Sequence, residues 1–242
     1  MRKYRGYTAT LILATILSPF TSGAAAQANT AGVTGGSPLA NPVQSITVHN
    51  GTILDGLAQL SAQSFEVSFS LEEILKPKFN GPEVPQVRFD LDLRNRTFSE
   101  VLDALCERDL RYAWTRDGSA VNVFPRALEH DSSYFVNRRI PQLELKDLKN
   151  AGEAAFAVIA ELPPPFEQIA YAQAGGDISY AAPWRASLRD VTVRQAFNLI
   201  ARQLSPRGGW ILSGSVNFRT IGFHNGPILY HSIDLPKMDS AR

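Results

Sequence analysis

Hydrophobic and polar positions alternate most regularly between residues 87 and 125. Residues 87–94 alternate apolar and charged side chains, and this period of two predicts a half-buried strand. Residues 98–105 carry apolar side chains at helical spacing, which predicts an amphipathic helix. Alternation resumes at residues 110–114, and Asp117-Gly118 is a typical hairpin turn before a returning strand. The stretch therefore predicts the order strand, helix, strand, turn, strand.

The predicted helix begins at a capping box formed by Thr97 and Glu100. In this arrangement the threonine hydroxyl accepts a hydrogen bond from the Glu100 N–H, and the carboxylate accepts one from the Thr97 N–H. A second capping box, Thr192 with Gln195, stands near the end of the chain. Two helix starts with the same chemistry suggest that the unit around residues 87–125 is repeated.

The same pattern surrounds three threonines, each preceded two positions earlier by Asn or Asp. Residues one, five, eight and nine positions after each threonine are apolar or small, and these offsets share one helical face. Chance similarity between amphipathic units is the alternative, but the shared Asn/Asp-x-Thr motif favours a true internal repeat. The three sets begin at Thr52, Thr97 and Thr192 and comprise Ile53, Leu57, Leu60 and Ser61; Phe98, Leu102, Leu105 and Cys106; and Val193, Phe197, Ile200 and Ala201.

The spacing of the threonines leaves room for a fourth, degenerate copy between the second and the third. We expect its strand at residues 134–140 and its helix from Asn150, with Glu153 in the first turn. Residues 163–184 are expected to form a connector. It opens with the Pro-rich run at residues 162–166, for which a docking strip is the alternative. Because one βαβ unit cannot bury enough apolar surface alone, we expect the units to pack in pairs.

These patterns predict an α+β fold of repeated βαβ units, which form small mixed sheets that are each covered on one face by two helices. One domain is expected at residues 44–127, and a second, divergent domain at residues 132–230. Residues 29–43, rich in Gly, Ala, Ser and Asn, are expected to be a flexible linker, and residues 231–242 a tail.

Residues 1–28 have the pattern of a secretory signal peptide. Arg2, Lys3 and Arg5 precede a short apolar segment, and the small residues at 24–26 and 26–28 offer two cleavage sites. The apolar segment is shorter than the roughly 20 residues that a membrane span requires, although an uncleaved anchor is the alternative. We therefore expect an exported protein, periplasmic in a Gram-negative bacterium or secreted, with no membrane span after cleavage.

The charge and the cysteine content argue against nucleic-acid binding and against an internal disulfide. The chain has a formal net charge of +1; removing the signal takes three of its 24 basic residues and none of its 23 acids, which leaves about −2. Such a protein lacks the basic surface that nucleic-acid binding needs, so no nucleic-acid partner is expected. The only cysteine, Cys106, cannot form an internal disulfide, and we interpret it as a buried structural thiol because no histidine lies near it in sequence.

Residues 45–125 resemble the secretin and TonB N-terminus short domain. The resemblance rests on ITVHNGTILDGLAQLSAQS, FEVSFS and FDLDLRNRTFSEVLDALCERDLRYAWTRDGSAVNVF, where Leu93, Thr97, Leu102 and Leu105 occupy the positions of the family pattern and Cys106 replaces its last leucine. Residues 185–224 resemble the second half of the domain again. The resemblance implies a βαβ-βαβ fold in the periplasm and contacts with envelope proteins, such as an outer-membrane receptor or a secretion channel component. No secretin core follows, so we expect a free-standing module.

The sequence selects no catalytic, cofactor-binding or metal-binding residues. His224, His231 and Asp234 could be drawn as metal ligands but lack the close spacing of known sites. No nucleophile elbow or phosphate-binding loop is present. Acidic residues such as Glu72, Glu73, Asp90 and Asp92 are expected to lie on solvated faces.

Four aromatic residues are the candidate partner-binding side chains: Tyr112, Trp114, Trp184 and Trp210. They would present rings at a sheet edge or hairpin, although packing in the core is the alternative. An unpaired edge strand could also form a homodimer. We expect a non-enzymatic periplasmic interaction module associated with outer-membrane transport, secretion or signalling; the alternative is an exported hydrolase or a protein that binds a small ligand or carbohydrate.

Overall fold

The computed structural model describes residues 37–64, 66–78, 80–163, 169–171, 179–216 and 218–228. The predicted signal peptide and the predicted tail at 231–242 lie outside the described residues, as does the predicted linker up to residue 36. The predicted linker at 29–43 extends too far, because its last residues are structured. A 3-10 turn at Pro38–Ala40 buries Leu39, and the first strand begins at Pro42.

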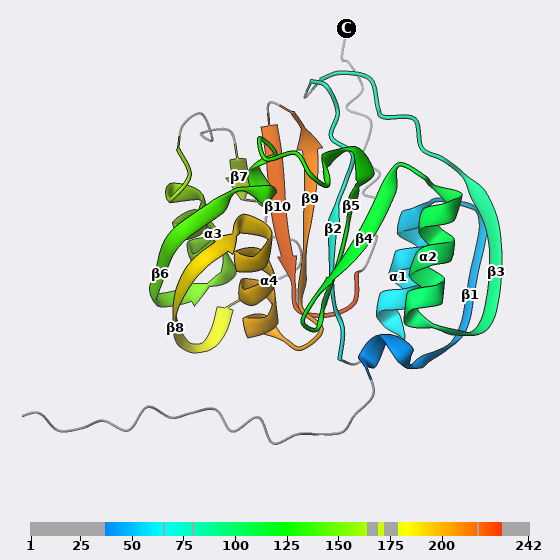
Figure 1. Cartoon of the computed structure of the whole chain (residues 1–242), viewed down its shortest axis with the longest axis horizontal. Coiled ribbons are helices and arrows are strands. Elements are labelled where there is room, and N and C mark those ends of the chain that lie inside the picture. The colour runs from blue at the N-terminus through cyan, green and yellow to red at the C-terminus, as the bar shows by residue number, and fades with distance from the viewer. Residues whose placement is uncertain are drawn as a thin grey trace, which may run out of the picture. The chain divides into compact units, whose positions relative to one another are not determined.

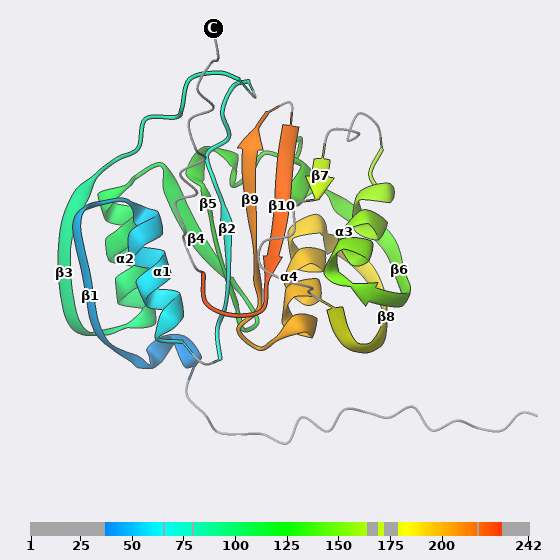
Figure 2. The same cartoon turned by 180° about the vertical axis from the view of Figure 1, so that it is seen from behind.

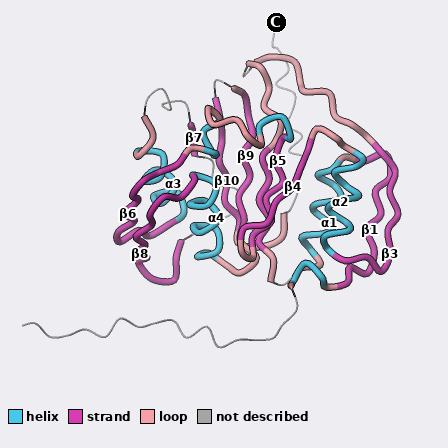
Figure 3. Tube along the Cα trace, viewed as in Figure 1, coloured by secondary structure: helices cyan, strands magenta, loops and turns pink. Residues whose placement is uncertain are grey.

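The chain consists of two halves with the same order of elements (Figures 1 and 3). The first half comprises β1 (Pro42–Gly51), α1 (Ile53–Ala62), β2 (Ser68–Glu72), β3 (Phe89–Thr97), α2 (Phe98–Arg108), β4 (Tyr112–Asp117) and β5 (Ala120–Pro125). The second comprises β6 (Arg139–Asn150), α3 (Ala151–Ala160), β7 (Ile169–Tyr171), β8 (Ser179–Thr192), α4 (Val193–Leu204), β9 (Gly209–Ser215) and β10 (Phe218–His224). The repeat predicted from the threonines is thus visible as a repeated order of strands and helices.

A residue in the left-handed backbone region precedes each helix. Asn50, Asn95 and Asp190 have φ values of 44°, 52° and 51°, and each lies two residues before the threonine that begins its helix. Before α3, Asp147 has a φ of 54°. Asn and Asp adopt this region more readily than other residues with a side chain. The Asn/Asp-x-Thr motif therefore has a conformational cause: the strand must turn sharply into its helix.

The predicted helix starts are confirmed. The Glu100 N–H donates to the Thr97 hydroxyl at 3.3 Å, and the Thr97 N–H donates to the Glu100 carboxylate at 2.8 Å. In the degenerate copy Asn150 caps α3 by accepting from the Glu153 N–H at 2.9 Å. All twelve residues at the repeated helical offsets are buried, as the shared apolar face predicts.

The strand of the degenerate copy differs from the prediction. It covers residues 139–150 rather than 134–140, and residues 135–137 form a 3-10 turn. Pro141 lies inside this strand, where it is tolerated because β6 pairs only with β8 in a two-stranded ribbon. The predicted connector at 163–184 likewise contains β7 and the start of β8.

The predicted α+β class is confirmed, but the sheets of the two halves are joined. The strands β4-β5-β2 and β9-β10-β7 form one six-stranded mixed sheet, through a parallel pairing of β2 with β9. Two antiparallel ribbons, β1-β3 and β6-β8, stand apart from this central sheet. The spans predicted as separate domains therefore share a sheet.

The helices of the two halves cover opposite faces of the central sheet (Figures 1 and 2). On β2, Phe69 and Leu71 pack into the core with α1 and α2, whereas Ser70 and Glu72 bond to residues of α4. Because neighbouring residues of a strand point to opposite faces, the two helix pairs lie on different sides. Each helix pair is covered in turn by its own ribbon.

The second half is therefore related to the first by two operations. A rotation by half a turn about an axis that lies in the sheet, perpendicular to the strands, is combined with a translation by three strands along that axis. Strand order and relative direction agree with this relation, since β5 is parallel to β2 as β10 is to β7. The relation leaves β4 at one edge of the central sheet and β7 at the other. Among the described residues, none of the helices has the length and apolar composition that a membrane span requires.

Candidate functional site

The edge strand β4 offers an open hydrogen-bonding surface of the central sheet. It pairs antiparallel with β5 through a two-residue hairpin, with Asp117 opposite Ala120. In such a hairpin the paired and unpaired positions alternate, so the main-chain groups of Trp114 and Arg116 point away from β5. Among the described residues no strand pairs with this side of β4.

The start of the same edge is closed by Arg126. Its Nε donates to the Leu110 carbonyl at 3.0 Å, and its Nη2 donates to the Tyr112 carbonyl at 2.9 Å. These bonds satisfy carbonyls that would otherwise face solvent. The open part of β4 is therefore short and centred on Trp114 and Arg116.

A groove of about 390 Å³ runs between β4 and α2 beside this edge. Trp114 is half-buried in it, and its Nε1 donates to Asp103 Oδ1 at 2.8 Å. Leu110, at one end, is 70% exposed. The acidic side chains of Asp103, Glu107 and Glu129 line the groove against the single charge of Arg126. We call this groove and the open part of β4 the β4 edge site.

Cys106 also borders the β4 edge site, but its chemistry is structural. The residue is 5% exposed, as expected for a buried thiol. Burial raises the pKa of the thiol to about 12, against the opposing effect of Arg126. The thiol therefore stays protonated at neutral pH and is a poor nucleophile.

Two of the four predicted partner-binding aromatics belong to the core instead. Trp210 is completely buried, donates from Nε1 to Asn198 Oδ1 at 2.8 Å, and packs its ring edge-on against Phe197. Tyr112 is 5% exposed, its hydroxyl accepts from the Ile74 N–H at 3.4 Å, and burial raises its pKa to about 12. Both rings point toward the helices of their own half, which removes them from the surface.

Trp184 lies on a different sheet from Trp114. It is half-buried on β8, where its ring packs against Tyr180 with centroids 5.5 Å apart. Because β8 belongs to the β6-β8 ribbon and β4 to the central sheet, the structure does not bring the four aromatics together. Only Trp114 contributes to the β4 edge site.

A buried polar row between the halves was missed from the sequence. Glu72, expected on a solvated face, is completely buried and forms two hydrogen bonds with Arg194 of α4, at 2.6 and 3.1 Å. Burial raises the pKa of Glu72, and Arg194 opposes this shift. Nearby, Asn198 donates to Asp117 at 3.0 Å. The sequence feature that could have revealed this row is the polar residue at every second position of β2: Ser68, Ser70 and Glu72. This polar face of the strand packs against α4 rather than facing water.

The structure describes only one of the three candidate metal ligands, His224. Within residues 37–228, as far as they are described, no cluster of His, Cys, Asp and Glu could hold a metal ion. His224 is a half-buried residue whose Nδ1 lies 2.6 Å from the Gly226 carbonyl, and burial lowers its pKa. His231 and Asp234 lie outside the described residues. Asp90 is exposed as expected, 3.6 Å from His49.

Comparison with known proteins identifies no relative: no protein-family model, curated protein or solved structure matches this chain.

Proposed function

We propose that this protein is a non-enzymatic interaction module of the bacterial cell envelope that binds an extended segment of a partner protein along β4. The observation that carries the proposal is the open edge at Trp114 and Arg116, whose main-chain groups have no partner strand among the described residues. An edge of this kind pairs with an added strand, which gains main-chain hydrogen bonds from the sheet.

The groove beside the edge supplies side-chain recognition. Trp114 offers a half-buried ring and Leu110 an exposed apolar side chain, and both are suited to contact alternate residues of an added strand. Asp103, Glu107 and Glu129 make the lining acidic. We therefore expect the partner segment to carry Lys or Arg beside apolar residues, because opposite charges steer and orient association.

The resemblance to the secretin and TonB N-terminus short domain supports the proposed setting. That family implies contacts with outer-membrane receptors or secretion channels in the periplasm, and the predicted signal peptide is consistent with export. The structured repeats of strand, helix and strand agree with the βαβ-βαβ fold that the resemblance implies. We accordingly propose an envelope protein of a transport, secretion or signalling system as the partner.

Photo-crosslinking from the β4 edge tests this proposal. A benzoylphenylalanine replaces Arg116 at the edge, and a matched protein carries it at Lys146, an exposed residue of the β6-β8 ribbon. Both proteins are produced in a Gram-negative host and irradiated in intact cells. We expect a defined crosslinked envelope protein from position 116 and not from position 146.

Hydrogen exchange on the purified complex then identifies the mode of binding. The amides of Trp114 and Arg116 should exchange fast in the free protein and slowly in the complex, because an added strand accepts their hydrogen bonds. The amides of Ala113 and Thr115, already bonded to β5, should be protected in both. Equal crosslinking from both positions, or unchanged exchange at residues 114 and 116, would refute the proposal.

A further inference from the structure

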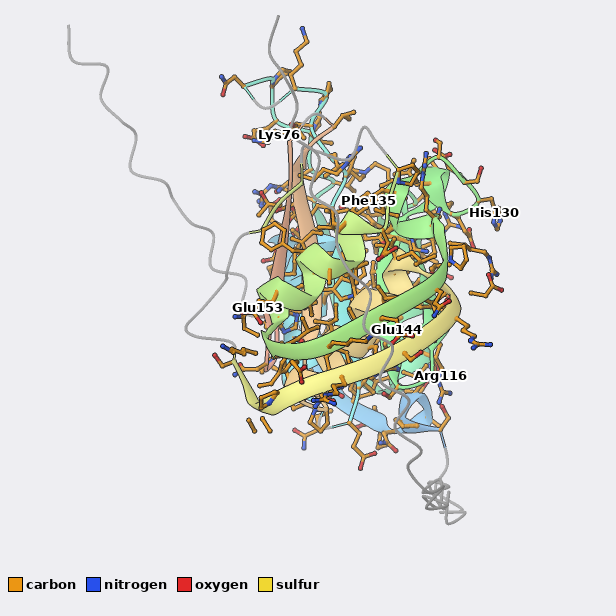
Figure 4. All side chains as sticks on the ribbon, turned by 90° about the vertical axis from the view of Figure 1, so that its left-hand side faces the viewer. Lys76, Arg116, His130, Phe135, Glu144 and Glu153 are labelled. Atoms are coloured by element: carbon orange, nitrogen blue, oxygen red, sulfur yellow. The ribbon has the colours of Figure 1, made fainter. Side chains whose placement is uncertain are left out.

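A second cavity lies at the end of the central sheet where β2 ends and the β9-β10 hairpin turns. Its volume is about 730 Å³, within the range of sites that bind small molecules. In Figure 4, Lys76 marks this end of the molecule, and Arg116 lies at the opposite end. The wall is largely apolar and is formed by Ile74, Leu75, Leu110, Leu128 and Val216.

Arg219 of β10 is one of the charged residues that line this cavity. Its guanidinium stacks on the ring of Phe135, with Cζ 5.2 Å from the ring centroid. Its Nε is buried without a hydrogen bond, and no carboxylate forms an ion pair with it among the described residues. Burial lowers the pKa of Arg219, which remains charged at neutral pH because a guanidinium titrates only in strong base.

The other charged groups near the cavity already have partners. Arg111 is held by Asp109, with Nη2 2.7 Å from Oδ2, and Arg126 donates to main-chain carbonyls. Asp131 accepts from Ser133, which lowers its pKa. Glu72, on the sheet behind Tyr134, is committed to Arg194. Once the Arg111–Asp109 pair cancels, Arg126 and Arg219 face Asp131 alone in the lining, so the cavity keeps a net positive charge.

An unpaired, partly buried guanidinium is costly, and an anion that accepts its N–H groups would relieve that cost. The planar fork of arginine matches the two oxygens of a carboxylate. Because most of the remaining wall is apolar, we expect the rest of such a ligand to be apolar too. We propose that this cavity binds an amphipathic carboxylate with the chemistry of a medium-chain fatty acid, whose head group lies against Arg219 and whose chain lies along the apolar wall.

Isothermal titration calorimetry with decanoate tests this site on the purified protein. Saturable binding of one decanoate per chain is expected, and 1-decanol, which lacks the charge, should bind at least tenfold more weakly. Arg219→Met should weaken decanoate binding by about tenfold or more and leave decanol binding unchanged. Arg185→Met, on the exposed β6-β8 ribbon, is the matched control and should change neither.

A second variant keeps the test decisive if Arg219→Met folds poorly, as judged by circular dichroism. Val216 lines this cavity but not the groove of the β4 edge site. Because it is 50% exposed, Val216→Glu should fold normally. Its negative charge at the cavity should weaken decanoate binding more than decanol binding. The site fails if decanoate does not bind saturably, if both variants bind it as the native protein does, or if N-acetyl-Leu-Leu-Leu binds more tightly, since that result would assign the cavity to peptide C-termini.

Discussion

Replacing Arg194 by Met isolates the charge that joins the two halves. Arg194 is 13% exposed and its partner Glu72 is 1% exposed, so both groups have left water. Methionine keeps an unbranched side chain over the ring of Phe124, on which the guanidinium now stacks at 4.9 Å. The main loss in this variant is therefore the ion pair rather than packing.

The expected cost is large because the variant leaves Glu72 buried without its cation. Removal of one partner from a buried pair typically costs about 3–5 kcal/mol, against about 0–1 kcal/mol for an exposed pair. The matched control is Arg185→Met, which breaks the Arg185–Asp147 pair, whose side chains are 74% and 64% exposed. The double variant Glu72→Gln/Arg194→Met buries no charge and should recover most of the loss.

The cost should depend on pH in a direction that follows from Glu72. Burial already raises its pKa above the ordinary 4.5, and loss of Arg194 removes the interaction that opposes this shift. A group whose pKa is higher in the folded state adds stability below its unfolded pKa and loses it as pH rises through the folded value. Arg194→Met should therefore be much closer to the native protein at about pH 5 than at about pH 7.5.

Urea unfolding followed by circular dichroism at both pH values measures these differences. The reasoning would be refuted if Arg194→Met cost no more than Arg185→Met at the higher pH. It would also be refuted if the cost were the same at both pH values, because the loss could not then come from an uncompensated carboxylate.

Three further predictions concern the first half. Gly56→Ala should destabilise by about 1–3 kcal/mol in urea unfolding despite the better helix propensity of alanine, because the added Cβ would meet Leu105 Cδ2 at 2.3 Å where α1 crosses α2; a gain in stability would contradict this close approach. Cys106 should resist Ellman's reagent at about pH 8 and react fully in urea, because burial raises its pKa to about 12; fast reaction of the native protein would show that the thiol is accessible. Thr97→Ala should cost about 1 kcal/mol by removing the cap of α2, while Thr97→Ser should keep most of it.

Local structure was predictable because its signals are local. The caps at Thr97 and Thr192, and the helical offsets that follow them, depend on residues within one or two turns. The left-handed Asn and Asp residues could be noticed as a motif, and the structure supplies the reason for it. Even the degenerate copy is recognisable from Asn150, but its strand lies later than predicted, because Pro141 is atypical of a strand interior.

The joined sheet was not predictable, because it depends on a pairing between segments far apart in the chain. No feature of the β2 sequence identifies β9 as its neighbour. The pairing of Leu71 with Ile211 depends on the fold of both halves. The same long-range contact buries Glu72, which local patterning placed in solvent. Trp210 shows a second limit of the sequence. The alternating pattern of a strand does not tell whether the sheet face that carries an aromatic side chain is covered by helices or exposed to solvent.

The pairing of β2 with β9 also bears on solubility. Separated from each other, the two halves would expose the edges β4, β2, β9 and β7, and each would be a template for uncontrolled association. In the fused chain β2 and β9 cover each other, and the polar row on β2 is sealed beneath α4. Duplication within one chain thus protects against aggregation, since each half is the permanent cover of the other's most vulnerable strand.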